Sequence, residues 1–280
     1  MGGVYLMLWL YDEFETDFTY NGIVLNNAYD SDIHWVLNTM YKLTFKYPTV
    51  DNDLYSFIEK GMIVKADEHD RYRSWEHCYS HFMTARKEND VNLDYLSLQL
   101  AFYLASWGMY RGSSFLIQKD YRVHIPVVRE ILSNKYDSLA GIECKDFKNE
   151  TNQKLLKEIN EFIANYYDGI RREVRGAALK NNLSDTLITK ILMGTLGCVP
   201  AYDRYFVTGI RSQKIASGTY NIKSILQLVD FYEKNIEQLD SVQKNFNVAD
   251  MLYPQMKILD MGFWQIGFDL DNKKIDHSII

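Results

Sequence analysis

The chain has 280 residues, with 31 basic and 37 acidic side chains and a formal net charge of −6. Its length is near the upper limit for a single hydrophobic core, so we expect residues 1–280 to form one globular unit, in which two helical lobes could pack around a cleft. The acidic balance excludes a protein that coats nucleic acid by charge alone, because that requires a strongly basic surface.

Cysteine content and the N-terminal residues bear on the compartment. The 3 cysteines are widely spaced and form no CxxC pair, which argues against a disulfide framework and a zinc ribbon. The apolar run Val4–Leu10 is too short to span a bilayer and lacks the basic start and cleavage site of a signal peptide. We therefore expect a cytoplasmic protein that does not associate with membranes.

The first part of the chain contains two predicted extended segments, followed by helices. Asn21-Gly22 is typical of a turn between two short strands. Apolar residues at helical spacing predict a helix from Ser31 to the residues before Pro48, and a short helix over 53–60. A further helix is predicted to start near Ser74.

The segment Leu93–Met109 is so apolar that its apolar residues cover most of the circumference of a helix. A helix of this kind normally lies at the centre of a core. The elements predicted after it are a helix over 126–134, an irregular connector over 137–149, a helix over 152–167 that continues over 170–179, two helices flanking Pro200, a long helix over 221–245, and a last helix from Pro254 to Trp264. The sequence therefore predicts an all-α fold with minor β-structure near the N-terminus.

The segment Val199–Asp203 forms the break between the two helices that flank Pro200. Pro200 is suited to open the second helix, and a carboxylate such as Asp203 is favoured in a first helical turn. With Phe206 three residues after Asp203, this segment resembles the helix-hairpin-helix DNA glycosylases, in which a short apolar turn leads to an essential Asp at the mouth of the base pocket. The resemblance rests mainly on residues 181–206.

The stretch Lys180–Thr186 occupies the position of the hairpin in that family, and it lacks the glycines of the usual Leu-Pro-Gly-x-Gly signature. Asn181 and Asn182 tolerate the left-handed conformation that such a turn needs. Ser184 or Asp185 would then cap the following helix. The resemblance thus implies a two-lobed, glycosylase-like helical fold with an unusual hairpin.

The resemblance also implies an enzyme that flips a damaged or modified base out of double-stranded DNA and hydrolyses its N-glycosidic bond without a cofactor or metal. Asp203 would be the catalytic residue, because a carboxylate stabilises the oxocarbenium-like charge that builds on the sugar. The amine nucleophile of the strand-cutting members of that family corresponds here to Ser184 or Asp185. Lys190 lies too far along the helix for that position and is left as the weaker candidate for a Schiff base. The expected enzyme is therefore monofunctional and leaves an abasic site. By analogy with glycosylases that excise modified bases from viral genomes, an anti-phage role fits such a divergent member.

The remaining site residues follow from the same resemblance and from local charge. Residues 171–214 carry eight basic and three acidic side chains in an otherwise acidic chain, which suits phosphate contacts. The aromatic residues expected to line the pocket or to act as a wedge are Trp107, Tyr110 and Tyr202. The expected DNA-binding residues are Arg111, Asn181, Asn182, Ser184, Thr186, Lys190 and Arg204.

Two other functions are alternatives. Arg71 and His77 resemble the Arg–His pair of HEPN-type helical ribonucleases, which cleave RNA without a metal. A helical protein that binds a partner and has no enzymatic activity is the second alternative. His77 and His81 also have a spacing that can bind zinc, but the sequence offers no further ligands, so we expect no metal site. Nothing marks a heptad seam, and the sequence leaves the oligomeric state open.

Overall fold

The computed structural model describes residues 18–20, 23–25, 73–175, 183–245, 247–248 and 251–277. The chain divides into two compact units, residues 1–66 and 67–280. In the first unit, strands β1 (Phe18–Tyr20) and β2 (Ile23–Leu25) pair antiparallel. They are the two extended segments predicted on either side of Asn21-Gly22. The helices predicted before Pro48 and over 53–60 lie outside the described residues.

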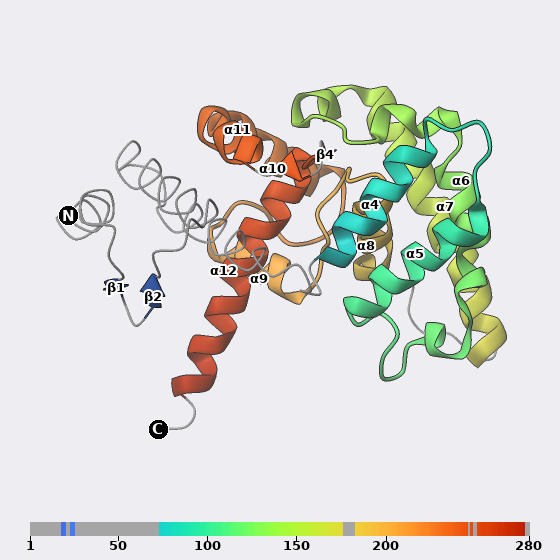
Figure 1. Cartoon of the computed structure of the whole chain (residues 1–280), viewed down its shortest axis with the longest axis horizontal. Helices are drawn as coiled ribbons and strands as arrows, with labels where there is room; N and C mark the ends of the chain where they lie inside the picture. Colours follow the sequence, from blue (N-terminus) through green and yellow to red (C-terminus); the bar gives the residue numbers. More distant parts are fainter. Residues whose placement is uncertain are drawn as a thin grey trace. The chain divides into compact units, whose positions relative to one another are not determined.

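The described part of the second unit is almost entirely helical, which confirms the all-α fold (Figure 1). Its α-helices are α4 (Arg73–Ala85), α5 (Leu93–Ser106), α6 (Ile125–Ile131), α7 (Glu150–Arg175), α8 (Asp185–Thr195), α9 (Arg204–Ser212), α10 (Ile222–Lys234), α11 (Ile236–Asn245) and α12 (Gln255–His277). Its 3-10 helices are η1 (Phe115–Gln118), η2 (Tyr121–His124), η3 (Asn134–Leu139) and η4 (Cys144–Lys148). Strands β3 (Asn247–Val248) and β4 (Met251–Leu252) pair antiparallel. None of the helices among these residues is long and apolar enough to cross a membrane.

Several predicted helix boundaries differ from the observed ones. The helix expected over 221–245 is divided into α10 and α11, because Asn235 is the C-cap of α10 and its side-chain amide donates to the carbonyl of Phe231 (2.8 Å). Helix α12 continues past Trp264 to His277. By contrast, α7 passes through Gly169 without a break, as predicted.

Pro200 does not open α9, so the prediction that it takes the first helical position was wrong. The helix begins at Arg204, and Asp203 is its N-cap. Hydrogen bonds from side chains of α8 and α12 hold the backbone of Ala201 and Tyr202 in a turn outside the helix. The helices predicted on both sides of the turn are confirmed as α8 and α9.

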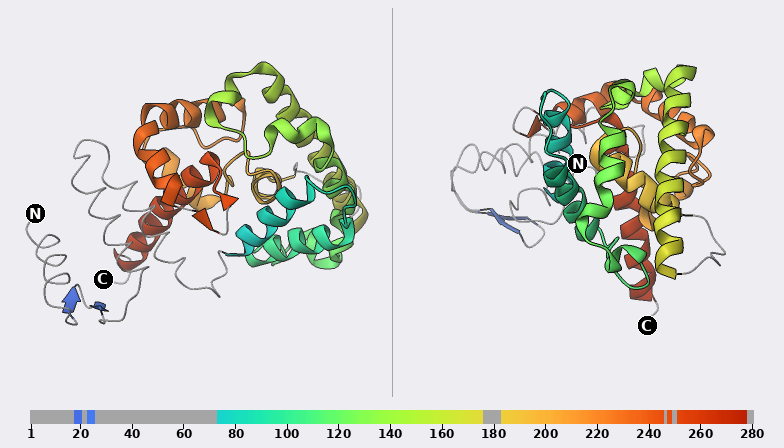
Figure 2. Two further views of the ribbon diagram at one scale, coloured as in Figure 1. Left: turned by 45° about the horizontal axis from the view of Figure 1, so that its top comes forward. Right: turned by 90° about the vertical axis from the view of Figure 1, so that its right-hand side faces the viewer.

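Helix α8 is the most deeply buried helix of the described part. It contacts α4, α5 and α7, and Figure 2 shows it surrounded by other helices. Every residue from Leu187 to Thr195 is buried. The segment that was predicted to lie at the centre of the core, Leu93–Met109, forms α5. This helix is not central, because its side chains Leu98 and Phe102 are 46% and 57% exposed. That prediction was wrong because a helix that is apolar on all sides carries no signal of which side faces the core.

Helices α9 and α12 form the closest helix pair. A Cβ atom added at Gly209 would lie 1.9 Å from the carbonyl oxygen of Phe263, and one added at Gly267 would lie 1.9 Å from the carbonyl oxygen of Tyr205. Only glycine permits such an approach between two backbones. The contact fixes the N-terminal end of α9, and with it Asp203, against the middle of α12.

Candidate functional site

Asp203 caps α9 with its side chain. Its Oδ1 atom accepts hydrogen bonds from the backbone N–H groups of Tyr205 and Phe206, both at 3.1 Å. Asp is a preferred N-cap, because the first turn of a helix has N–H groups without partners and a favourable dipole for negative charge. The Asp203 side chain is 16% exposed, so its carboxylate is neither fully buried nor free in solvent.

Lys190 provides the second contact to this carboxylate. Its Nζ atom donates to Asp203 Oδ2 at 3.0 Å and lies 4.7 Å from the centre of the Trp107 ring. The lysine side chain is only 3% exposed. Because a buried ammonium is costly without a partner, Asp203 and the face of Trp107 together stabilise it. Helix capping is enough to explain why an aspartate stands at position 203. It does not explain why a lysine lies inside the most buried helix.

Two threonines of α8 hold the turn that leads to Asp203. The hydroxyl of Thr186 donates to the carbonyl oxygen of Tyr202 at 2.9 Å, and the N–H of Tyr202 donates to the hydroxyl oxygen of Thr189 at 2.9 Å. Both bonds come from the first two turns of α8, which Ser184 caps through the N–H of Leu187. The position of the Asp203 carboxylate is therefore coupled to α8 through the backbone of the turn as well as through Lys190.

A second lysine–aspartate pair lies on α12. Lys257 Nζ donates to Asp260 Oδ2 at 2.8 Å, and Asp260 Oδ1 accepts from the N–H of Ala201 at 2.9 Å. The Lys257 ammonium lies 4.9 Å from the centre of the Trp75 ring and 5.8 Å from that of Trp107. The sequence analysis did not identify this pair, although Lys257 and Asp260 stand three residues apart in a helix that follows Pro254.

Tyr103 lies among these charged groups. Burial raises its pKa well above the usual range, and the charges of Asp260, Cys78 and Asp203 raise it further. Its phenol therefore keeps its proton throughout the physiological pH range. No residue pattern in the sequence indicated this neighbour.

A row of aromatic rings continues from Trp107 along α12. The ring centres of Trp107 and Trp264 lie 6.1 Å apart, and Trp264 contacts Tyr205 at 5.2 Å and stacks on Phe268 at 5.2 Å. These rings are partly exposed. Arg204 covers the Tyr205 ring with its guanidinium group at 4.6 Å. The sequence analysis found only Trp107 and Arg204, because the remaining rings belong to α9 and α12, which meet only in the fold.

Two of the predicted aromatic residues have other partners. Tyr202 is 4% exposed, packs against Phe206, and shares a 2.9 Å hydrogen bond with the hydroxyl of Ser224. The hydroxyl of Tyr110 is hydrogen-bonded to Nε2 of His124 at 2.6 Å. Of the three predicted aromatic residues, Trp107 is the one whose ring has a described contact with the Lys190 ammonium.

The predicted basic and polar residues are partly assembled at the site. Lys190 and Thr186 belong to α8, and Ser184 is its N-cap. Arg204 begins α9, where its Nη2 atom donates to Asp271 at 2.8 Å. Arg111 is exposed in the turn after α5. The predicted residues Asn181 and Asn182, and with them the proposed hairpin, lie outside the described residues.

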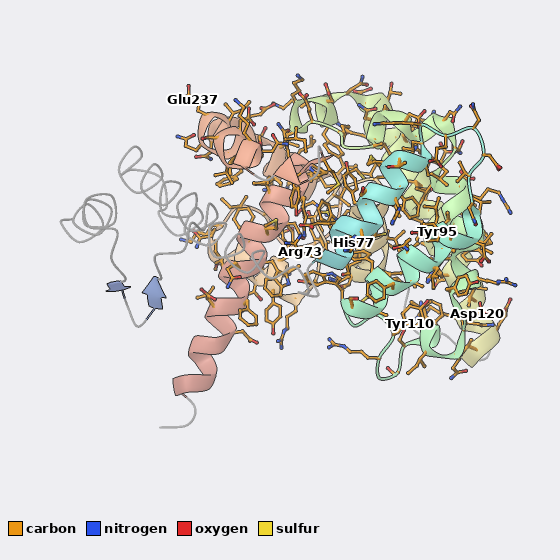
Figure 3. All side chains as sticks on the ribbon, viewed as in Figure 1. Arg73, His77, Tyr95, Tyr110, Asp120 and Glu237 are labelled. Carbon is orange, nitrogen blue, oxygen red and sulfur yellow. The ribbon has the colours of Figure 1, made fainter. Side chains whose placement is uncertain are left out.

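The residues of the ribonuclease alternative and of the histidine pair with zinc-binding spacing lie on or before α4. His77 is exposed on this helix, and Figure 3 shows it on α4 with Tyr95 on the neighbouring α5. Arg71 lies outside the described residues. The Nε2 atom of His81 is hydrogen-bonded to the hydroxyl of Tyr95 at 3.1 Å. Within the described ranges, no group of three or more His, Cys, Asp or Glu side chains could hold a metal ion.

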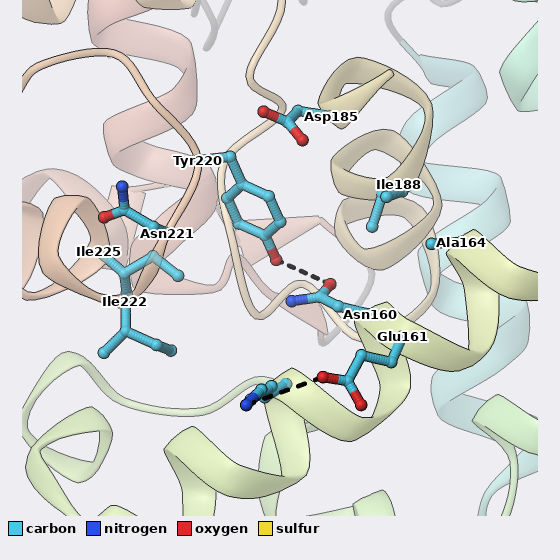
Figure 4. A pocket seen from close by; sticks show the side chains of 10 residues that line it. Asn160, Glu161, Ala164, Asp185, Ile188, Tyr220, Asn221, Ile222 and Ile225 are labelled. Carbon is cyan, nitrogen blue, oxygen red and sulfur yellow. Dashed lines mark hydrogen bonds and ion pairs between the residues drawn. The ribbon is translucent and has the colours of Figure 1, made fainter. Parts of the chain in front are cut away.

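Two of the hollows that are lined by described residues do not include Asp203 in their walls. The first, of about 340 Å³, lies beside α7, α8 and the start of α10 (Figure 4). In it Tyr220 donates to Asn160 Oδ1 at 2.9 Å, and the walls include Ile188 and Ile225. The second, of about 560 Å³, is lined by α4 and by residues around Asp137 and Leu252.

Comparison with known proteins gives no relative for this chain: no family model, no curated protein and no solved structure matches it.

Proposed function

We propose that this chain is a DNA N-glycosylase that binds double-stranded DNA, flips a damaged or modified base, and hydrolyses the bond between that base and its sugar. The observation that carries the proposal is the Lys190–Asp203 pair, in which a buried lysine beside the Trp107 ring holds a carboxylate that is 16% exposed. A buried lysine fixed on a capping carboxylate is more than helix capping requires.

Asp203 is suited to stabilise the transition state. Breaking the glycosidic bond builds positive charge on the sugar, and a carboxylate held in place beforehand stabilises that charge. Two N–H groups and one ammonium occupy three of the roughly four acceptor positions of a carboxylate. The remaining position can accept a hydrogen bond from the attacking water. Lys190 and the N–H groups hold the carboxylate in this orientation.

Water is the proposed nucleophile, so the product is an abasic site in an unbroken strand. An amine must be free of its proton and accessible to attack a sugar carbon. The ammonium of Lys190 is ion-paired and 3% exposed, and it therefore suits a positioning role. No cofactor or metal takes part in the proposed reaction.

The surroundings of Asp203 suit a flipped base. An extruded base is held between aromatic or apolar walls, and the partly exposed rings of Trp107, Tyr205 and Trp264 offer such walls. Arg204, which is 69% exposed, and the exposed Ser184 at the start of α8 suit contacts with phosphate groups.

The proposal is tested by incubating the full chain with duplex DNA that carries assorted damaged or modified bases, followed by alkaline cleavage. We expect base release, and a loss on the order of 100- to 1000-fold in Asp203→Asn, which keeps a good N-cap. Asp230→Asn, an exposed acid on α10, is the matched control and should act at the wild-type rate. Borohydride should trap no covalent product.

Two results would contradict the proposal. One is base release by Asp203→Asn at the wild-type rate, and the other is no release from any substrate by a folded wild-type chain. Cleavage of RNA that is lost in His77→Ala and kept in Asp203→Asn would instead favour the ribonuclease.

A further inference from the structure

Helix α5 exposes a continuous apolar stripe. Tyr95, Leu98 and Phe102 are 42%, 46% and 57% exposed, and Ala105 is also exposed. Their spacing of three, four and three residues matches the a and d positions of a heptad, which lie on one side of a helix. We call these four residues the α5 stripe.

The α5 stripe is not a consequence of loose packing. The opposite side of the same helix is buried, with Leu96, Leu100 and Leu104 at most 3% exposed. Single exposed apolar residues are common on protein surfaces, but a contiguous row at heptad spacing is typical of a helix that packs against another helix. The Tyr95 ring contacts His81 of α4 at one edge of the stripe, and the four members remain exposed, so no described helix covers this side of α5 as a whole.

A second copy of α5 in the antiparallel direction fits the stripe. A two-fold axis near the middle of the helix places Tyr95 opposite Ala105 of the other copy, and Leu98 opposite Phe102. Large side chains then face smaller ones, which is the arrangement that lets two helices interlock. A two-fold axis uses the same surface on both copies, so one stripe supplies both sides of the contact.

The charges at the two ends of α5 favour the same arrangement. Just before the helix the exposed Glu88 and Asp90 outnumber the exposed Lys87, and Arg111 is exposed just after it, with its guanidinium folded against Gly108. Neither the two acids nor Arg111 forms an ion pair with another described residue. In an antiparallel pair, the acidic end of each α5 lies beside Arg111 of the other copy, whereas a parallel pair would bring like charges together.

We propose that the chain forms a homodimer through antiparallel contact of the α5 stripes. The inference is independent of the proposed glycosylase activity, because neither the stripe nor its charged ends contact Asp203 or Lys190. Dimerisation removes the apolar side chains of the α5 stripe from water.

The first test measures the mass of the full chain in solution by sedimentation equilibrium over a range of concentrations. We expect a dimer that dissociates on dilution, and Phe102→Glu should weaken association about 100-fold. Ile236→Glu is the matched control, because Ile236 is 45% exposed at the start of α11 and lies outside the stripe. Circular dichroism should show that both variants keep the helical fold.

The second test exchanges the charges at the ends of α5. Arg111→Glu alone and the pair Glu88→Arg with Asp90→Arg should each weaken the dimer, and the combination of all three changes should restore it. A monomer at every concentration overturns the proposal, as does equal weakening by Phe102→Glu and Ile236→Glu. A combination that fails to restore association overturns the antiparallel arrangement.

Discussion

Helices α5 and α8 contact each other, but they differ in which side chains they bury and which they expose to solvent. Helix α8 contains Lys190 and is buried from Leu187 to Thr195, whereas the more apolar α5 leaves large apolar side chains in solvent. Each helix thus carries one feature that folding of a lone chain does not require. In α8 it is a buried charge, on which the proposed activity rests, and in α5 it is an exposed apolar stripe, on which the proposed dimer rests.

The largest effect is expected when the buried charge of α8 loses its partner. Asp203→Ala leaves the Lys190 ammonium buried with only the Trp107 ring, and it also removes the N-cap of α9. We expect the free energy of unfolding to fall by about 3–5 kcal/mol in urea titrations. In Asp203→Asn the free energy of unfolding should fall clearly less, because Asn still caps the helix and can accept a hydrogen bond from lysine.

The control for this prediction is the ion pair of α5. Asp94 contacts Arg122 at 3.0 Å, but both side chains are about half exposed or more. Asp94→Ala should therefore change stability far less than Asp203→Ala, because exposed pairs are screened by water. Similar losses in the two variants would mean that the Lys190–Asp203 pair is not a buried pair in solution.

The same substitution in both helices is expected to have very different effects on stability. Leu192 in α8 is fully buried and Leu98 in α5 is 46% exposed. Leu192→Ala should lower the free energy of unfolding by about 3 kcal/mol through lost burial and a residual cavity, and Leu98→Ala by about 0.5 kcal/mol or less. Urea titration at concentrations where the chain is monomeric measures both. A loss in Leu98→Ala as large as that in Leu192→Ala would show that α5 is covered by its own chain.

Local sequence signals predicted much of the fold. The strand pair beside Asn21-Gly22, the start of α4 near Ser74, and the helices before and after Pro200 all depend on residues close together in sequence, and the structure confirms them. The capping role available to Asp203 belongs to the same class of signal, although the helix begins after this residue and not at Pro200.

The site itself was only partly predictable. Lys190 and Asp203 stand on different helices, and the distance between them depends on the turn that Thr186 and Thr189 hold. The sequence therefore suggested a DNA contact for Lys190 and gave no sign of its ion pair. The exposed side of α5 was missed for a related reason: with apolar residues on every side, periodicity could not separate the core-facing side from the outer one.

A pH-dependent effect is expected on the buried side of α5, which contacts η2. His124 of η2 is fully buried, and its two ring nitrogens are hydrogen-bonded to the hydroxyl groups of Tyr110 and Tyr167. Burial lowers the pKa of His124 to about 3, below its ordinary value of 6.5. A neutral imidazole donates at one nitrogen and accepts at the other, so one tyrosine accepts from the ring and the other donates to it.

The unfolded chain binds a proton at His124 at a higher pH than the folded chain does. The stability that the neutral, buried imidazole contributes is therefore fully present above pH 6.5 and is lost as the pH falls toward 3. We expect a loss of about 2 kcal/mol between pH 6.5 and pH 5 from this residue. Urea titrations across this range should show a shallower pH dependence in His124→Gln than in the wild type, since carboxylates contribute equally to both. An imidazole that titrates near pH 6.5 by NMR in the folded chain would contradict the prediction, and would mean that the inner side of α5 is as open to water as its stripe.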